Sequence, residues 1–184
     1  MIYQSVKNKT SIKIQLIAAL IAIVAAVALP QLVHTVGLVS GTGTALGEIL
    51  LPMHLPVILV GLLAGTYAGA IAGALSPVIS FAITAMPTSV MLPFMVIELC
   101  VYGAVAGLLK EKNISSIWKV LIAQISGRAI RAVAILFSVY VLSASKLPVS
   151  IIWTSIPKGL FGIILQLVLL PLIVFYVDKK GSEL

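Results

Sequence analysis

Apolar residues dominate the chain in five long runs that are separated by short, more polar segments. The runs cover roughly residues 14–33, 55–85, 92–109, 117–142 and 152–177. A helix needs about 20 apolar residues to cross the hydrocarbon core of a bilayer. The run 55–85 is too long for one span. The pattern therefore predicts an all-α, polytopic membrane protein, with residues 1–184 forming a single integral membrane domain.

Basic residues at the ends of the runs predict the number of spans and their orientation. They cluster at three places: Lys7, Lys9 and Lys13; Lys110, Lys112 and Lys119; and Lys179 and Lys180. The other connections, 34–54, 86–91 and 143–151, carry only Lys146. The positive-inside rule places the lysine-rich segments and both termini in the cytoplasm. An even number of spans must then separate Lys13 from Lys110. We therefore expect 55–85 to be a hairpin turning near Gly65-Thr66, and six transmembrane helices in the cell membrane.

Composition excludes several classes of protein. Hydrophobic residues make up 61% of the chain and charged residues 9%, so a soluble domain is excluded. The formal net charge of +7 is explained mostly by the span ends, and no aromatic-basic surface indicates a nucleic-acid partner. The single cysteine, Cys100, excludes an internal disulfide. The start MIYQSVKNKTSIK is polar and basic, and the apolar run after it reaches about 20 residues without an A-x-A-like cleavage site. This predicts a retained first span and not a signal peptide.

Small residues recur at helical spacing in two spans. In the predicted hairpin glycine occupies every fourth position: Gly61, Gly65, Gly69 and Gly73. This spacing allows helix backbones to approach closely in lipid and favours tight packing within the chain. In the first span Ala18, Ala22 and Ala25 or Ala26 share one face. Two interpretations of this alanine stripe stay open: internal packing, or a docking surface for a partner membrane protein.

Four ionisable residues lie deep inside apolar runs: Glu98, Arg128, Arg131 and Lys158. A charge at mid-bilayer costs about 3 kcal/mol even on lenient scales, so such residues indicate a polar site. Helical spacing predicts three polar faces: Gln124, Arg128, Arg131 and Ser138; Glu98, Tyr102 and Phe94; and Lys158 with Phe161, Gly162, Leu165 and Gln166. At about 1.5 Å of rise per residue, their depths are compatible with one outward-opening cavity lined by the fourth, fifth and sixth spans.

Two explanations account for these charges. One is an internal ion-pair network in which Glu98 binds Arg128 or Arg131. However, one carboxylate cannot compensate three cations, and two positive charges would remain. The other is a ligand carboxylate or phosphate, which arginine binds well. His54 and Glu48, near the external end, are either polar loop residues or ligand contacts. The predicted substrate-binding residues are Arg128, Arg131, Lys158, Glu98, Gln124, His54 and Tyr102.

The loops and the absence of catalytic motifs restrict the possible functions of the chain. The predicted external segments 34–54, 86–93 and 143–151 are candidates for a lid, because a loop as long as 34–54 is more often functional than decorative. The chain has no G-x-x-x-x-G-K-[ST] motif for ATP, no H-E-x-x-H zinc motif and no G-x-S-x-G nucleophile motif. We therefore expect no enzyme activity, no cofactor and no metal site.

These features together resemble the substrate-binding S components of energy-coupling factor (ECF) vitamin transporters. The resemblance covers essentially the whole chain: six short helices, a basic N-terminus, the stripe Ala18, Ala22 and Ala26, a long first external loop, and the run LPVILVGLLAGTYAGAIAGALSP. It is strongest over 50–109, especially in LLPMHLPVILVGLLAG and ELCVYGAVAGLL. Within the family the chain is most similar to the pantothenate type.

The resemblance implies that the chain binds a vitamin near the external face under its loops. It also implies that the alanine stripe associates with a transmembrane coupling protein, the T component. Two cytoplasmic ATPases would then drive import by toppling the S component. The alternatives are an S component for another vitamin or precursor, an autonomous proton-coupled transporter that uses Glu98, and a structural assembly subunit of the membrane.

Overall fold

The computed structural model describes residues 10–142 and 148–182, and over these residues it is all-helical. Within them, six helical segments are long and apolar enough to cross a membrane, as predicted. Lys7, Lys9, Lys146 and most of the predicted 143–151 loop lie outside the described residues. The helices are α1 (Ile12–Val39), α2 (Ala45–Leu50), α3 (His54–Ala64), α4 (Thr66–Thr84), α5 (Leu92–Leu109), α6 (Ser116–Tyr140), α7 (Ile151–Lys158) and α8 (Leu160–Ser182).

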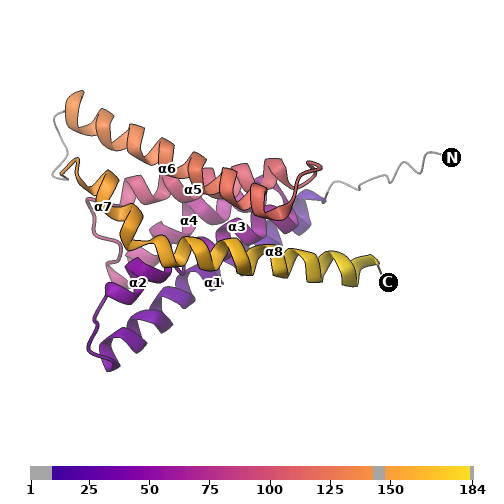
Figure 1. The fold of residues 1–184 in the computed structure, drawn as a ribbon, viewed down its shortest axis with the longest axis horizontal. Helices are drawn as coiled ribbons and strands as arrows, with labels where there is room; N and C mark the ends of the chain where they lie inside the picture. The colour runs from indigo at the N-terminus through magenta and orange to yellow at the C-terminus, as the bar shows by residue number, and fades with distance from the viewer. Residues whose placement is uncertain (1–9, 143–147, 183–184) are drawn as a thin grey trace.

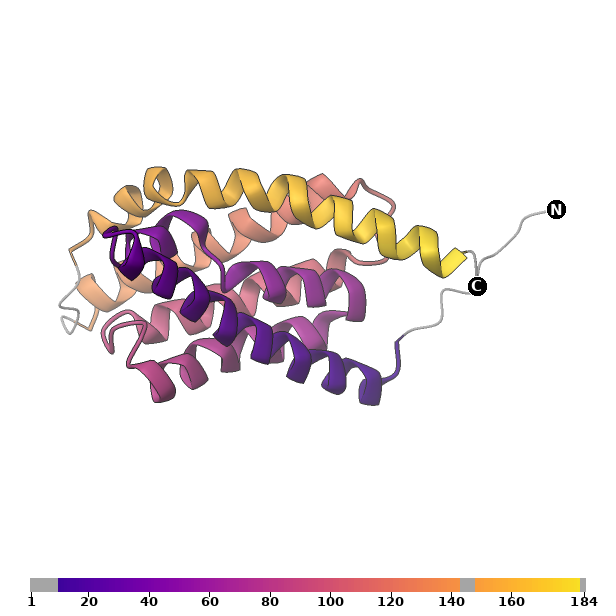
Figure 2. The ribbon, with the colours of Figure 1, turned by 90° about the horizontal axis from the view of Figure 1, so that it is seen from below.

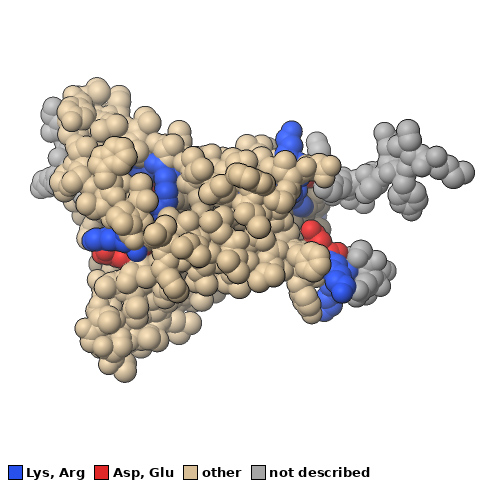
Figure 3. All heavy atoms as spheres, viewed as in Figure 1, with Lys and Arg blue, Asp and Glu red and all other residues tan. Residues whose placement is uncertain are grey.

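The long helices run along a common axis, and the described parts near both termini lie at one end of the bundle, beside the α5–α6 loop (Figures 1 and 2). Lys110 Nζ donates to Thr10 Oγ1 at 2.6 Å, and Lys119 Nζ donates to the carbonyl oxygen of Lys110 at 2.7 Å. We call this the basic end, and the opposite end the cavity end. On the face shown in Figure 3 the charged side chains lie toward the two ends, and the middle is uncharged.

The predicted hairpin at 55–85 is confirmed. The α3 helix ends at Ala64 and α4 begins at Thr66. Between them Gly65 has a φ of +118°, a conformation that side-chain-bearing residues rarely adopt. Gln15 of α1 secures the turn, because its Oε1 accepts a hydrogen bond from the backbone N–H of Ala68 at 3.4 Å.

The glycines of the hairpin pack inside the chain, against α5. A Cβ added at Gly69 would overlap the backbone of Gly103, and one added at Gly73 would overlap the carbonyl of Leu99. The same holds for Gly61, where an added Cβ would lie 2.5 Å from the carbonyl oxygen of Gly103. Tight internal packing, predicted from the four-residue spacing, is therefore confirmed.

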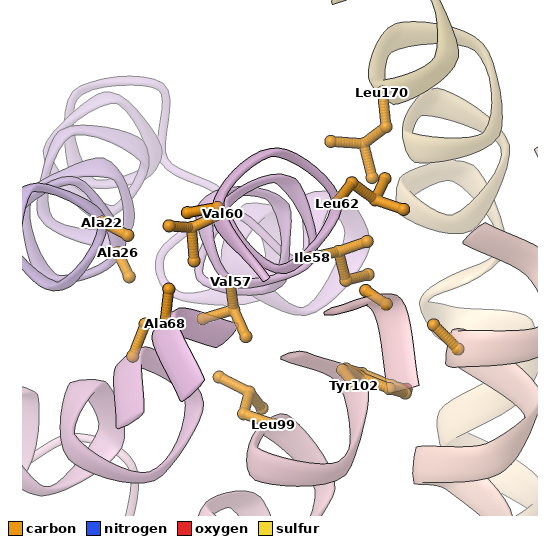
Figure 4. Packing of buried hydrophobic residues seen from close by; sticks show 14 of the residues in the cluster. Ala22, Ala26, Val57, Ile58, Val60, Leu62, Ala68, Leu99, Tyr102 and Leu170 are labelled. Atoms are coloured by element: carbon orange, nitrogen blue, oxygen red, sulfur yellow. The ribbon is translucent and has the colours of Figure 1, made fainter. Parts of the chain in front are cut away.

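The alanine stripe of α1 also faces the interior. Ala22 and Ala26 are 6% and 0% exposed and point toward Val60 and Ala68 of the hairpin (Figure 4). Ala18 is half-buried against the same core. Of the two interpretations of the stripe, the structure supports internal packing. The burial of Ala22 and Ala26 leaves these two side chains little exposed surface, and the docking role of the stripe Ala18, Ala22 and Ala26 stays a prediction.

The sixth span is not one continuous helix. Pro157 lies inside the last turn of α7, and Gly159 separates α7 from α8. The predicted face shared by Lys158 with Phe161, Gly162, Leu165 and Gln166 is therefore wrong. Lys158 is exposed, whereas Gln166 is buried in the bundle.

The segment 34–54 is more helical than predicted. The α1 helix continues to Val39, beyond the expected end of the first span, and α2 occupies Ala45–Leu50. Leu51 has a left-handed conformation, with a φ of 50°, and ends α2. The segment thus contains the end of α1, the short helix α2 and two brief connections, and it lies over the cavity end.

Candidate functional site

A cavity of about 350 Å³ lies at the cavity end, between α1, α2, the start of α3, α4, the 86–91 loop, α5, α6 and α7. Sites for small molecules in proteins have volumes of roughly 300–1,000 Å³. Five of the predicted substrate-binding residues line this cavity: Arg128, Arg131, Lys158, Glu98 and His54. The other two, Gln124 and Tyr102, are not part of its lining. Charged residues of α5, α6 and α7 thus lie around one cavity.

Glu98 of α5 has a partner on each carboxylate oxygen. Arg131 Nη1 donates to Oε2 at 3.0 Å, and the Tyr102 hydroxyl donates to Oε1 at 2.7 Å. The side chain of Glu98 is 1% exposed and that of Arg131 is 12% exposed. The predicted face of Glu98 with Tyr102 is confirmed, as is an ion pair between Glu98 and one of the two arginines. The charge of Arg131 is therefore compensated within the chain.

Arg128 has no such partner. It lies one turn before Arg131 on α6 and lines the same cavity, yet its Nε is buried without a hydrogen bond. No ion pair of Arg128 is found within the part of the chain that the structure describes. Arg128 is half-buried, and a partly desolvated guanidinium without an anion is unfavourable, since the loss of hydration is not offset. Arg128 is thus the group in the cavity wall that most needs an anionic partner.

Lys158 lies at the mouth of the cavity, paired with Glu48. Their charged atoms are 3.1 Å apart, and the side chains are 63% and 57% exposed. An exposed pair of this kind contributes little stability, roughly 0–1 kcal/mol. The cavity lining therefore holds three cations and two carboxylates, and one positive charge remains. The sequence-based expectation of two surplus charges is wrong because it did not include Glu48.

Gln124 belongs to a relay of hydrogen bonds that joins three elements. Its Nε2 donates to Gln166 Oε1 at 2.9 Å, and Gln166 Nε2 donates to the Leu51 carbonyl at 3.3 Å. Both glutamines are buried. The relay links α6 to α8 and to the end of α2, below the cavity. In this structure Gln124 supports the cavity wall and does not face the ligand space.

Tyr102 and His54 pack behind Glu98. Their ring centroids are 5.3 Å apart and both side chains are buried, but only His54 lines the cavity. Gly127 of α6 makes room for the tyrosine, because a Cβ there would overlap the Tyr102 ring. Tyr102 therefore acts on the cavity through Glu98, which it holds in place.

Other lining residues were not predicted. Gln31 and His34 of α1 face the cavity, as do Ser80 of α4 and Met95 of α5. Gln31 and His34 are the polar residues near the end of a long apolar run, spaced three apart, and this was the available signal. Within the described residues, no group of three or more His, Cys, Asp or Glu side chains could hold a metal ion.

The cavity therefore combines a surplus guanidinium with unpaired polar groups and apolar walls, an arrangement suited to binding a small anion. A family model described as ECF transporter, substrate-specific component, matches residues 9–174. No curated protein and no solved structure gives a significant match. The matched range includes every residue of the cavity lining. The family comprises transporter components and not enzymes, and its members generally work with a membrane T component and ATPases. The chain belongs to the ECF transporter family of substrate-specific components.

Proposed function

We propose that this chain captures a small carboxylate vitamin for an ECF importer, with pantothenate as the best candidate. The observation that carries the proposal is Arg128, a half-buried cavity residue whose buried Nε has no hydrogen bond and whose charge has no ion-pair partner within the described residues. Arginine presents two parallel N–H donors that match a carboxylate. A ligand carboxylate would supply the missing charge.

Pantothenate matches the chemistry of the cavity. It has one carboxylate, two hydroxyls and an amide. Its carboxylate would neutralise the one surplus positive charge of the lining, and its other groups suit the polar side chains there. The sequence resemblance to the pantothenate type supports the same choice. A cavity of about 350 Å³ is at the small end of the usual range, which suits a vitamin of this size.

The charge distribution supports uptake from outside. The three lysine-rich segments of the sequence predict a cytoplasmic basic end. The cavity is at the opposite end of the bundle, so this orientation exposes it to the external side. Captured vitamin would then be delivered inward by the T component and two cytoplasmic ATPases. The chain itself carries no P-loop motif, so ATP hydrolysis is assigned to these partners.

The proton-coupled alternative has less support. A carboxylate that carries protons must exchange them during transport. Both oxygens of Glu98 are bonded, one to Arg131 and one to Tyr102, and the group is buried. Because both of its oxygens are bonded, Glu98 is better suited to act as a fixed structural charge than to exchange protons.

Two measurements test the proposed function. In the first, the chain is purified in detergent from cells grown with pantothenate, and any bound small molecule is identified by mass spectrometry. We expect pantothenate. A chain that carries no small molecule and binds none would support the assembly-subunit alternative.

The second measurement is uptake into proteoliposomes. We expect pantothenate uptake only when the T component, the ATPases and ATP are all present. Transport by the chain alone, driven by a proton gradient, would contradict the proposal and support the Glu98 transporter.

A further inference from the structure

Two polar side chains of α1 face the cavity with unpaired atoms. Gln31 Nε2 and His34 Nδ1 are buried and form no hydrogen bond with any residue that the structure describes, and both residues line the cavity. Most buried polar atoms in proteins are hydrogen-bonded, and each exception requires an explanation. Here the unpaired atoms border a space that can hold a ligand. A ligand atom is therefore the partner that the geometry offers them.

The local structure holds these side chains in place. They are three residues apart and share one face of α1 with the buried Pro30, which also lines the cavity. The imidazole of His34 lies against Gly47 of α2, where an added Cβ would come within 2.6 Å of its Cε1 atom. Thr35, the next residue, is exposed and donates instead to the Gln31 carbonyl at 2.8 Å. The pair Gln31 and His34 is thus a preformed feature of the wall.

This pair is on the far side of the cavity from Arg128. The α1 helix packs against α2, α3 and α4, whereas α6 packs against α5 and α8. The two helices lie on opposite sides of the bundle (Figure 1). A ligand that reaches both walls must therefore be extended, with different groups at its two ends.

The unpaired atoms of Gln31 and His34 determine which chemical groups the second end of the ligand must carry. A glutamine Nε2 only donates hydrogen bonds, so it requires an oxygen acceptor. An imidazole nitrogen either donates or accepts, and a hydroxyl can satisfy it in both cases. We propose that Gln31 and His34 form a second polar subsite, which binds an uncharged, hydroxyl-bearing end of the ligand whose carboxylate pairs with Arg128. The subsite would select hydroxylated acids over simple carboxylic acids. This inference rests on the proposed function.

Two matched probes distinguish binding at the carboxylate end of the ligand from binding at its hydroxyl end. Pantothenate is compared with the same acyl-β-alanine lacking both hydroxyls, which keeps the carboxylate, the amide and the carbon skeleton. Dissociation constants are measured by titration calorimetry on the purified full chain in detergent. The variants are Gln31→Leu and His34→Phe, with Thr35→Val as control on the same helix. Gln31→Glu keeps the side-chain size but replaces the donor with an acceptor, and it serves if a hydrophobic variant does not fold.

We expect the wild-type chain to prefer pantothenate over the hydroxyl-free probe by about tenfold or more, since a site built to bond a hydroxyl rejects an analogue without it. Gln31→Leu and His34→Phe should lose most of this preference by weakening pantothenate binding alone. Gln31→Glu adds a negative charge that repels both anionic probes, so it should weaken the binding of both and also lose most of the preference between them. Thr35→Val should keep it.

A wild-type chain that binds both probes equally would overturn the inference while the proposed function stands. Folded variants that retain the preference would overturn it in the same way. A wild-type chain that binds neither probe would overturn the pantothenate assignment, and the inference with it.

Discussion

Two arginines one turn apart on α6 have different surroundings. Arg131 is paired with the buried Glu98, whereas Arg128 faces the cavity with an unpaired Nε. The first therefore stabilises the fold, whereas the second has no anionic partner among the described residues, which supports its proposed role in ligand binding. Their helical spacing alone could not separate these roles, because the partner of each depends on how α5 rotates against α6.

We predict that Arg131→Gln destabilises the chain. The substitution leaves Glu98 buried at 1% exposure without its cation. Removing one partner of a buried ion pair costs about 3–5 kcal/mol. Thermal unfolding in detergent would measure the loss. Arg128→Gln should change the unfolding temperature little, and equal effects of the two substitutions would show that their roles are not distinct.

Spacing in the sequence predicted the charged residues of the cavity but not all of their partners. The i, i+4 spacing of Glu98 and Tyr102 correctly indicated a shared face. Lys158 pairs with Glu48, which is 110 residues away, so no local pattern could indicate that contact. Gln31 was also missed, since its exposure to the cavity depends on how α1 packs.

At the scale of the elements, α4 and α5 pack against each other through glycines. Gly69 and Gly103 face each other so closely that a Cβ on either would overlap the other's backbone. A backbone contact of this kind cannot be relieved by a side-chain rotation. The four-residue spacing predicted such packing, but it did not identify α5 as the partner.

We predict that Gly103→Ala destabilises the chain by about 1–3 kcal/mol or more, the usual cost of overpacking. Helix propensity alone predicts the opposite sign, since alanine is favoured over glycine by roughly 1 kcal/mol in a helix. The unfolding temperature in detergent decides between them. Ala82→Val, at an exposed position of α4, is the control and should have little effect. A stabilised Gly103→Ala variant would show that the α4–α5 contact is looser than described.

The α1 helix supports a second prediction at this scale. Ala22 is 6% exposed inside the core, whereas Ala28 is exposed. Ala22→Leu should therefore lower the unfolding temperature, while Ala28→Leu should not. Ala22→Leu with unchanged stability but abolished uptake would instead support the predicted docking role of the stripe.

The breaks in the helices were only partly predictable. Gly65 was identified as a turn, because the run was too long for one span. Pro157 and Gly159 also indicate a helix break, but the continuous apolar pattern of 152–177 predicted a single span. Hydropathy indicates which segments lie in the membrane, whereas backbone dihedral preferences determine where each helix ends.

For the whole molecule, the basic end and the cavity end should respond differently to ligand. The segment 34–54 lies over the cavity and supplies part of its lining, including Glu48, whereas 110–117 is at the basic end. Ligand contacts should order the first segment and exclude water from the charged groups below it. Hydrogen exchange with pantothenate present should slow in 34–54 and stay unchanged in 110–117. Equal protection, or protection of 110–117 alone, would contradict an outward-opening cavity.

The central claim is that Arg128 holds the carboxylate of the ligand. The most direct test is calorimetric titration of the wild-type chain and Arg128→Gln with pantothenate and with panthenol, in which an alcohol replaces the carboxylate. A hydrogen bond to a charged group is worth about 1.5–3 kcal/mol, and 1.4 kcal/mol is already tenfold in affinity. The account predicts that the wild-type chain strongly prefers pantothenate and that Arg128→Gln weakens pantothenate binding by about tenfold or more. Binding of pantothenate as tight as wild type by a folded Arg128→Gln variant would contradict it.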